Sequence, residues 1–234
     1  MSPMTQSRPH QPTHHWPTLP LETVELAMGG SVWRVLAVRD QDALLDMADE
    51  LAQIPYGYLL WESAVALANW LAGHAALVAG RRVLELGAGM GLPGLVAASL
   101  GAHVWQTDHE PQTLAIAAHN AEQNDVGGIQ RFVADWRAWD HTDQYDLLLG
   151  ADILYERAMH PHLELIFQRN LAPGGKLVLA DPSRPQALEL LARLEHQGWR
   201  FELFMHAVTL PLTTGAPKPV DVAILVGKPV GSTS

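Results

Sequence analysis

A glycine-rich turn over residues 85–94 is the part of the sequence best suited to hold a ligand. It reads Glu-Leu-Gly-Ala-Gly-Met-Gly-Leu-Pro-Gly, after a predicted strand over residues 81–86 and at the start of a predicted helix over residues 92–100. Glycine lets the backbone approach a ligand closely, and the first amides of the helix are free to donate hydrogen bonds. The segment therefore predicts a ligand-binding turn.

The turn contains a literal G-x-G-x-x-G at residues 89–94, which raises the alternative of a nicotinamide-dinucleotide site. In such a site the first glycine follows the strand directly, which is Gly87, and the third position then falls on Leu92. Glu85 also stands where a dinucleotide site has an apolar residue. A buried carboxylate needs a partner, and a cationic amino-acid tail, a water or an amide would supply one.

Carboxylates and aromatic rings follow three further predicted strands. Asp108 can accept both hydroxyls of a ribose, and Asp135 beside Trp136 can bind an exocyclic amine while the indole stacks on an adenine. Asp152 and Tyr155 follow the fourth strand. All these strand ends converge on one edge of an open α/β sheet, where such folds bind ligands. Helix capping by the aspartates and ordinary packing of the rings are the structural alternatives.

Alternating strands and helices must position these residues. Two strands joined by Gly29-Gly30 predict an N-terminal hairpin. The alternation further along predicts an α/β, Rossmann-like doubly wound sheet, mostly parallel with an antiparallel edge strand pair. The predicted strands cover residues 22–28, 31–38, 81–86, 102–107, 129–134, 145–150, 175–180, 200–206 and 220–226, and the predicted helices cover 40–51, 63–80, 92–100, 111–123, 162–168 and 185–197.

Length and composition limit the classes of function. The chain has 234 residues, 48% of them hydrophobic, which fits one domain over residues 21–234, with a hairpin and helix extension over 21–80, after a proline-rich tail at 1–20. The net charge of −10 argues against binding to nucleic acid or anionic membranes. No cysteine is present, which fits a cytoplasmic protein. We expect a monomer.

Metal and membrane sites are not expected. The twelve histidines lack cysteine or a close carboxylate set, so a structural or surface role is favoured for His160 and His162. His109, next to Asp108, could contact the ribose of a bound cofactor. The uncharged stretch at residues 63–80 is only weakly apolar because it contains Asn69 and His74, so a buried core helix is favoured over a membrane span.

With these residues assembled, the sequence resembles the class I, seven-β-strand S-adenosylmethionine-dependent methyltransferases, through Glu85-x-Gly87-x-Gly89-x-Gly91. More narrowly, it resembles methyltransferase family 16, which contains many protein-lysine methyltransferases. The narrower resemblance is carried by residues 60–64 (Leu-Trp-Glu-Ser-Ala), 83–92, Asn120 with Asn124, Asp135-Trp136, and 149–155.

The resemblance implies S-adenosylmethionine as cofactor and assigns residues to two sites. Those implied to line the cofactor are Trp61, Gly87, Ala88, Gly89, Asp108, Trp136 and Ala151. Asp152 and Tyr155, in a D-x-x-Y signature, are implied to face the methyl-accepting group. The sequence departs from the family at one position. Glu62 follows Trp61 where related sequences usually have proline, at the implied entrance for the substrate.

The chemistry of methyl transfer suits these two residues. An amine acceptor arrives as ammonium, and Asp152 by charge and the Tyr155 ring by cation–π contact would attract and orient it. A helical turn starting at Asp152 would aim both at one cleft. We expect N-methylation of a protein lysine. Methylation of a small-molecule amine is the alternative, followed by a NAD-binding oxidoreductase or a non-catalytic binding module.

Overall fold

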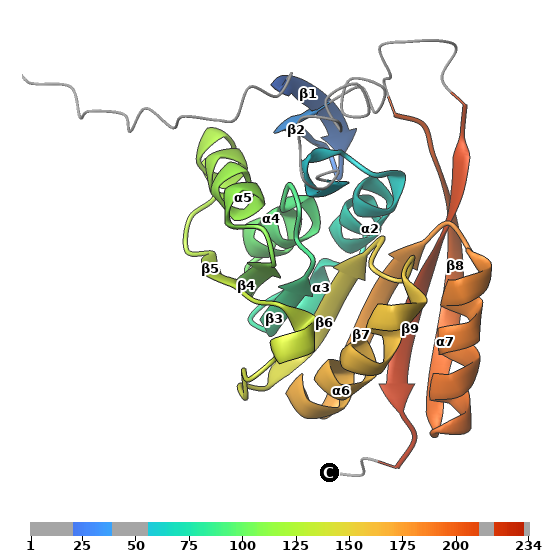
Figure 1. Ribbon diagram of the computed structural model, residues 1–234. Coiled ribbons are helices and arrows are strands. Elements are labelled where there is room, and N and C mark those ends of the chain that lie inside the picture. Colours follow the sequence, from blue (N-terminus) through green and yellow to red (C-terminus); the bar gives the residue numbers. More distant parts are fainter. Residues whose placement is uncertain (1–20, 39–55, 211–217, 232–234) are drawn as a thin grey trace, which may run out of the picture.

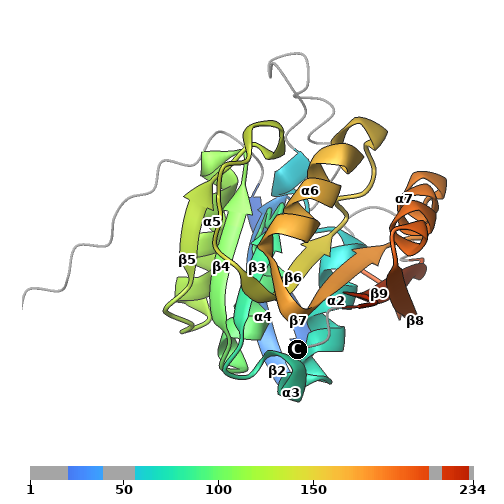
Figure 2. The ribbon, with the colours of Figure 1, turned by 90° about the horizontal axis from the view of Figure 1, so that it is seen from below.

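A seven-stranded sheet forms the centre of the computed structural model, which describes residues 21–38, 56–210 and 218–231 (Figure 1). The strand order is β5-β4-β3-β6-β7-β9-β8. The strands from β5 to β7 run parallel, and β9 is antiparallel to both of its neighbours. Figure 2 shows the strands fanned from β5 at one side to β8 at the other. The strands are β3 (Arg82–Leu86), β4 (His103–Asp108), β5 (Gln130–Val133), β6 (Tyr145–Ala151), β7 (Leu171–Asp181), β8 (Trp199–Val208) and β9 (Val220–Pro229).

Helices cover both faces of the sheet because successive strand residues point to opposite sides. On β3, Val83 joins the apolar cluster that contains α2, α4 and α5, while its neighbour Leu84 joins the cluster that contains α6 and α7. The helices are α2 (Glu62–Ala72), α3 (Ala75–Val78), α4 (Leu92–Ser99), α5 (Pro111–Gln123), α6 (His160–Asn170) and α7 (Pro185–His196). The predicted doubly wound sheet with an antiparallel edge pair is confirmed.

The predicted hairpin is also confirmed as β1 (Leu21–Met28) and β2 (Ser31–Val38), a separate two-stranded sheet. Asn120 of α5 and Asn124, which directly follows this helix, bind backbone groups on the free edge of β2. Asn120 accepts from the Leu36 amide at 2.7 Å and donates to its carbonyl at 3.2 Å, and Asn124 pairs with Arg34 at 2.9 and 2.6 Å. Four residues along a helix span about the same length as two along a strand. The two asparagines therefore act as a substitute neighbouring strand.

The prediction of one continuous helix over residues 63–80 is wrong. Helix α2 ends at Ala72, and the four-residue α3 follows after Gly73 and His74. His74 is no longer in a helical conformation, since its φ is −127° and its ψ is 39°. Its Nδ1 lies 2.7 Å from the Trp70 carbonyl, and the His74 and Trp70 rings stack. This local bonding competes with the helix ladder. No helix within the described ranges is both long and apolar enough to cross a bilayer.

The remaining predicted elements agree with the structure apart from shifts at their ends, the largest at the start of β7. The predicted helix over residues 40–51 and the predicted tail at 1–20 lie outside the described residues.

Candidate active site

The strand ends that carry the predicted site residues meet at one edge of the sheet. Leu86, at the end of β3, pairs with Thr107 of β4 on one side and with Gly150 of β6 on the other. Ala151, the last residue of β6, pairs with Ala180 of β7. The arrowheads of β6 and β7 mark this edge in Figure 1. The register therefore places the segments after four parallel strands beside one another.

The glycine-rich turn between β3 and α4 has a backbone that only glycine adopts easily. Gly87 has φ 60° and Gly89 has φ 49°, both in the left-handed region. A Cβ at Gly87 would lie 2.9 Å from Ile153 Cγ2 and 3.3 Å from Trp136 Cζ2, and a Cβ at Gly89 would lie 3.1 Å from the Gly57 carbonyl. The turn is thus closely bordered by the segments that follow β5 and β6 and by the segment that precedes α2.

Glu85 supports this turn from inside the protein. Its Oε2 accepts a hydrogen bond from Gln106 Nε2 at 2.8 Å, the backbone amide of Gly94 also donates to the carboxylate, and Gln106 donates further to the Gly91 carbonyl at 2.9 Å. Burial raises the pKa of Glu85 to about 7, although the hydrogen bonds from Gln106 and Gly94 and the charge of Arg131 lower it in part. The sequence left open a cationic amino-acid tail, a water or an amide as the partner of Glu85, and in the structure the side-chain amide of Gln106 is such a partner.

Asp108 closes the other side of the turn at the end of β4. Its Oδ2 accepts from the Gly89 amide at 2.9 Å and its Oδ1 from the Glu110 amide at 3.1 Å, and the side chain is buried. His109 Nδ1 lies 3.2 Å from Oδ1, and this hydrogen bond raises the pKa of His109. Asp108 is therefore held against the turn, where the sequence predicts a ribose.

Asp135 and Trp136 lie on the same edge but face different surroundings. Arg137 donates to both carboxylate oxygens of Asp135 at 2.7–3.0 Å, and its side-chain and backbone hydrogen bonds lower the pKa of Asp135 to about 2. Trp136 packs beside Gly87, as the contact distance above shows. The indole is thus placed next to the turn, whereas the Asp135 carboxylate is engaged by its own neighbour.

Asp152 does not begin the helical turn that would aim it and Tyr155 at one cleft. Its φ is 58°, its amide donates to the Ala180 carbonyl at 2.9 Å, and the next helical residue is Arg157 at the start of the short 3₁₀ helix η3 (Arg157–Met159). The Asp152 carboxylate is ion-paired with Arg184, which the sequence analysis did not predict. The two residues are 32 positions apart, and no local signal connects them.

Aromatic side chains surround the same edge. Tyr155 is 51% exposed and Tyr56 is 41% exposed, while the Trp61 indole donates to the Tyr56 carbonyl at 3.1 Å and its ring centre lies 6.2 Å from that of Tyr56. Burial raises the pKa of Tyr155, and the negative groups Glu156, Asp108 and Asp152 raise it further. Tyr56, in η1 (Tyr56–Tyr58), was missed because it lies just outside the residues that carry the resemblance.

The other predicted residues lie close by or have structural partners. Ala88 donates from its amide to the Thr107 carbonyl at 3.0 Å, and Glu62 is the first residue of α2, next to Trp61. His160 is buried, with Nε2 3.0 Å from the Leu154 carbonyl, which is the structural role favoured by the sequence. In the part of the chain that the structure describes, histidine and acidic side chains form no group of three or more suited to a metal.

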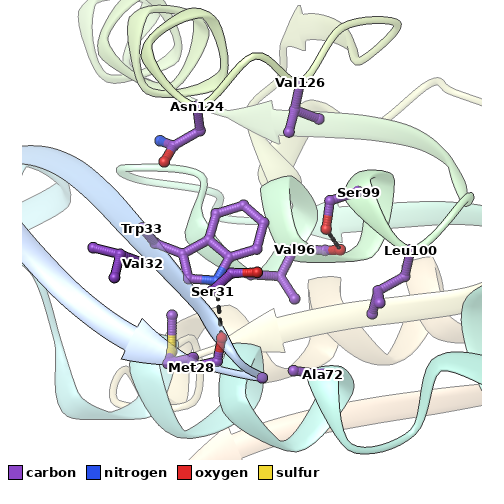
Figure 3. A pocket seen from close by; sticks show the side chains of 11 residues that line it. Met28, Ser31, Val32, Trp33, Ala72, Val96, Ser99, Leu100, Asn124 and Val126 are labelled. Carbon is purple, nitrogen blue, oxygen red and sulfur yellow. Dashed lines mark hydrogen bonds between the residues drawn. The ribbon is translucent and has the colours of Figure 1, made fainter.

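A hollow of about 420 Å³ lies away from this edge, between the hairpin turn, the last turn of α4 and the segment that follows α5 (Figure 3). Trp33 projects into its centre, and Val96, Leu100 and Val126 line its wall. No charged side chain lines it. The hollow therefore offers none of the chemistry gathered at the strand ends.

Comparison with known proteins identifies the family to which the chain belongs. A family model described as lysine methyltransferase matches residues 39–194. The chain belongs to the lysine methyltransferase family. The chain is 39% identical over 128 residues to the protein N-lysine methyltransferase METTL21A of Danio rerio, covering 52% of this chain and 58% of that protein. The resemblance seen in the sequence is thereby confirmed.

Two further similar proteins have names with different substrates. The chain is 34% identical over 124 residues to a histone-arginine methyltransferase METTL23 of Xenopus laevis, covering 50% of this chain and 53% of that protein. It is 32% identical over 196 residues to a protein N-terminal and lysine N-methyltransferase EFM7 of Eremothecium gossypii, covering 71% and 72%. The alignments thus span little more than half the length of the first two relatives.

Solved structures agree on the fold. A putative RNA methyltransferase from Pyrococcus horikoshii matches with a TM-score of 0.58 at 18% identity over 73% of this chain and 83% of that one. A precorrin-6y C5,15-methyltransferase from Geobacter metallireducens matches with a TM-score of 0.55 at 16% identity over 77% and 90%. The family and this fold imply S-adenosylmethionine as the methyl donor, and the Asp108 carboxylate beside the glycine-rich turn is the kind of acceptor that a ribose needs.

Proposed function

We propose that this protein transfers a methyl group from S-adenosylmethionine to the side-chain amine of a lysine in another protein. Membership of the lysine methyltransferase family supports the reaction. The observation that carries the choice of acceptor is the acidic cluster beside Tyr155, in which Asp152 and Asp181 share the single cation Arg184. Burial raises the pKa of Asp181, and with both carboxylates ionised one negative charge is left over. Asp152 acts by charge on the exposed Tyr155 ring, and the charge and the ring both attract an ammonium group.

The cofactor half of the site is assigned to the turn and its borders. Gly87 and Gly89 would let the backbone approach the ligand without a side chain in the way, Asp108 would accept the ribose hydroxyls, and the Trp136 indole would pack on the adenine. The sulfonium of the bound cofactor supplies a reactive methyl group, so the protein contributes placement and exclusion of water. The full proposed set is Trp61, Glu85, Gly87, Ala88, Gly89, Asp108, Asp135, Trp136 and Ala151.

The acceptor half is assigned to Asp152 and Tyr155. The lysine ammonium first gives a proton to water, and its nitrogen lone pair then forms the new carbon–nitrogen bond as the bond from the methyl carbon to sulfur breaks. Asp152 would orient the incoming cation by charge, and the Tyr155 ring would contact it by its face. The reaction leaves S-adenosylhomocysteine and a methylated lysine.

Transfer of a radiolabelled methyl group into a cell lysate tests this proposal. We expect label in protein bands, released as methyl-lysine on hydrolysis, and we expect Asp152→Asn to lower the rate about 10²-fold. Calorimetry with S-adenosylhomocysteine should give nearly the same affinity for both proteins. Label found only in the small-molecule fraction would support a metabolite amine instead, and label recovered as methyl-arginine would contradict the lysine assignment.

We also propose that the protein acts as a monomer in the cytoplasm. The absence of cysteine from the sequence supports a reducing compartment. Light scattering of the purified protein and fractionation of its host cells test the two statements separately.

A further inference from the structure

Arg184 lies between two carboxylates at the acceptor end of the site. It is ion-paired with Asp152, and its Nη1 donates to Asp181 Oδ2 at 3.0 Å while its backbone amide donates to Asp181 Oδ1 at 2.7 Å. The side chains are 27% exposed for Arg184, 9% for Asp152 and 1% for Asp181. One guanidinium thus holds together the end of β7, the start of α7 and the segment after β6.

This arrangement holds Asp152 in an unfavourable backbone conformation. A non-glycine residue at φ 58° is strained unless its surroundings determine it. The Asp152 amide is bound to the Ala180 carbonyl on one side, and the carboxylate is bound to Arg184 on the other. Arg184 therefore helps to set the direction in which the acceptor carboxylate points.

The same guanidinium changes what Asp152 does to a bound amine. A lone carboxylate favours the charged ammonium, which is unreactive toward a methyl group, whereas a nearby positive charge disfavours it. Within residues 56–210, the charged and titratable groups that the contacts place around this position are Asp152, Asp181, Arg184, Tyr155, Glu156, Tyr56 and Asp108. Arg184 is the cation of this described group, and it opposes the ammonium form.

We propose that Arg184 is a positioning residue of the acceptor site, which aims Asp152 and offsets its charge so that the bound amine gives up its proton readily. The proposal rests on the proposed function, because it takes the acceptor to be an amine. A unit charge at roughly 6 Å in an effective dielectric of about 40 shifts such an equilibrium about tenfold, which corresponds to about one pH unit.

Binding of n-butylammonium, which mimics the lysine side chain, tests the charge relation directly. The titration is followed by NMR on protein saturated with S-adenosylhomocysteine at neutral pH. We expect Arg184→Gln to bind the probe about tenfold more tightly than the wild type. Asp181→Asn should bind it about tenfold more weakly, because the leftover negative charge is removed. A purely structural role predicts weaker binding for both variants.

The rate of labelled methyl transfer against pH supplies a second readout. The midpoint should rise by about one pH unit in Arg184→Gln and stay within a few tenths of a unit, on the order of twofold in the equilibrium, in Arg184→Lys, which keeps the charge. Arg82→Gln is the matched control, since Arg82 opens β3 at the opposite end of the sheet and pairs with Asp143. It should leave both the probe affinity and the midpoint unchanged.

The outcomes separate the two proposals. Unchanged probe affinity and an unchanged midpoint in Arg184→Gln, with wild-type binding intact, would overturn the role of Arg184 alone. Failure of the probe to bind the wild type and both variants, although S-adenosylhomocysteine binds, would overturn the amine acceptor and the role of Arg184 together. If Arg184→Gln does not fold, the pH midpoint of Asp181→Asn still decides, because loss of the negative charge should lower it by about one pH unit, whereas a purely structural role leaves it unchanged.

Discussion

Replacing Glu85 with glutamine should make the protein more stable at alkaline pH than the wild type is. Glu85 is a buried carboxyl whose hydrogen-bond donors are the Gln106 amide and the Gly94 backbone amide. Burial raises its pKa from 4.5 to about 7, so its charged form is held at a cost in the folded state. A glutamine of the same shape keeps an acceptor oxygen and carries no charge.

The size and sign of the effect follow from the two pKa values. Because the pKa of Glu85 is higher in the folded than in the unfolded chain, the folded protein binds more protons between about pH 4.5 and about pH 7. The free energy of unfolding therefore falls as the pH rises through this range and levels off above it. A difference of about 2.5 pH units corresponds to about 3 kcal/mol, which the variant does not lose.

Urea unfolding followed by circular dichroism at about pH 5 and about pH 8 measures this difference. The gap between Glu85→Gln and wild type should shift in favour of the variant by up to about 3 kcal/mol between the two conditions. Glu195→Gln makes the same chemical change at an exposed position of α7 and gives the background. Parallel pH dependences for Glu85→Gln and wild type would refute the reasoning.

Three further predictions concern the turn and its supports. Gly87→Val should abolish calorimetric binding of S-adenosylmethionine, because a Cβ at this positive φ would lie 2.9 Å from Ile153 Cγ2 and the turn would have to shift. Gly101→Val, at φ 91° with no atom within 4 Å of a Cβ, should keep that binding despite similar backbone strain. Asp108→Ala and Trp136→Ala should each weaken S-adenosylhomocysteine by about 1–3 kcal/mol, and unchanged affinity in both would place the adenosine elsewhere. Asn120→Ala leaves the Leu36 amide and the Met90 carbonyl without their partner, so urea unfolding should show a loss of about 2–4 kcal/mol; a loss below about 0.5 kcal/mol would contradict the anchoring of the hairpin.

Local patterns in the sequence were enough to predict most of the elements. The alternation of strands and helices and the Gly29-Gly30 turn depend on neighbours in the chain, and both were confirmed. The glycine-rich turn was recognisable because Gly87 and Gly89 need a backbone geometry that other residues avoid, and their φ values agree. The break after Ala72 was missed because the competing contact of His74 with Trp70 forms only once both rings pack.

Contacts between polar groups that are far apart in the chain could not be predicted from local patterns. Glu85 finds its amide partner 21 residues away, and Arg184 meets Asp152 across 32 residues. No periodicity or motif predicts either pairing. Both depend on the register of the parallel strands, which determines the strand ends that lie side by side. The sequence determined that carboxylates stand at the strand ends, because strand position sets that. The fold determined which of them are neutralised, because the strength of an ion pair depends on distance and burial in three dimensions.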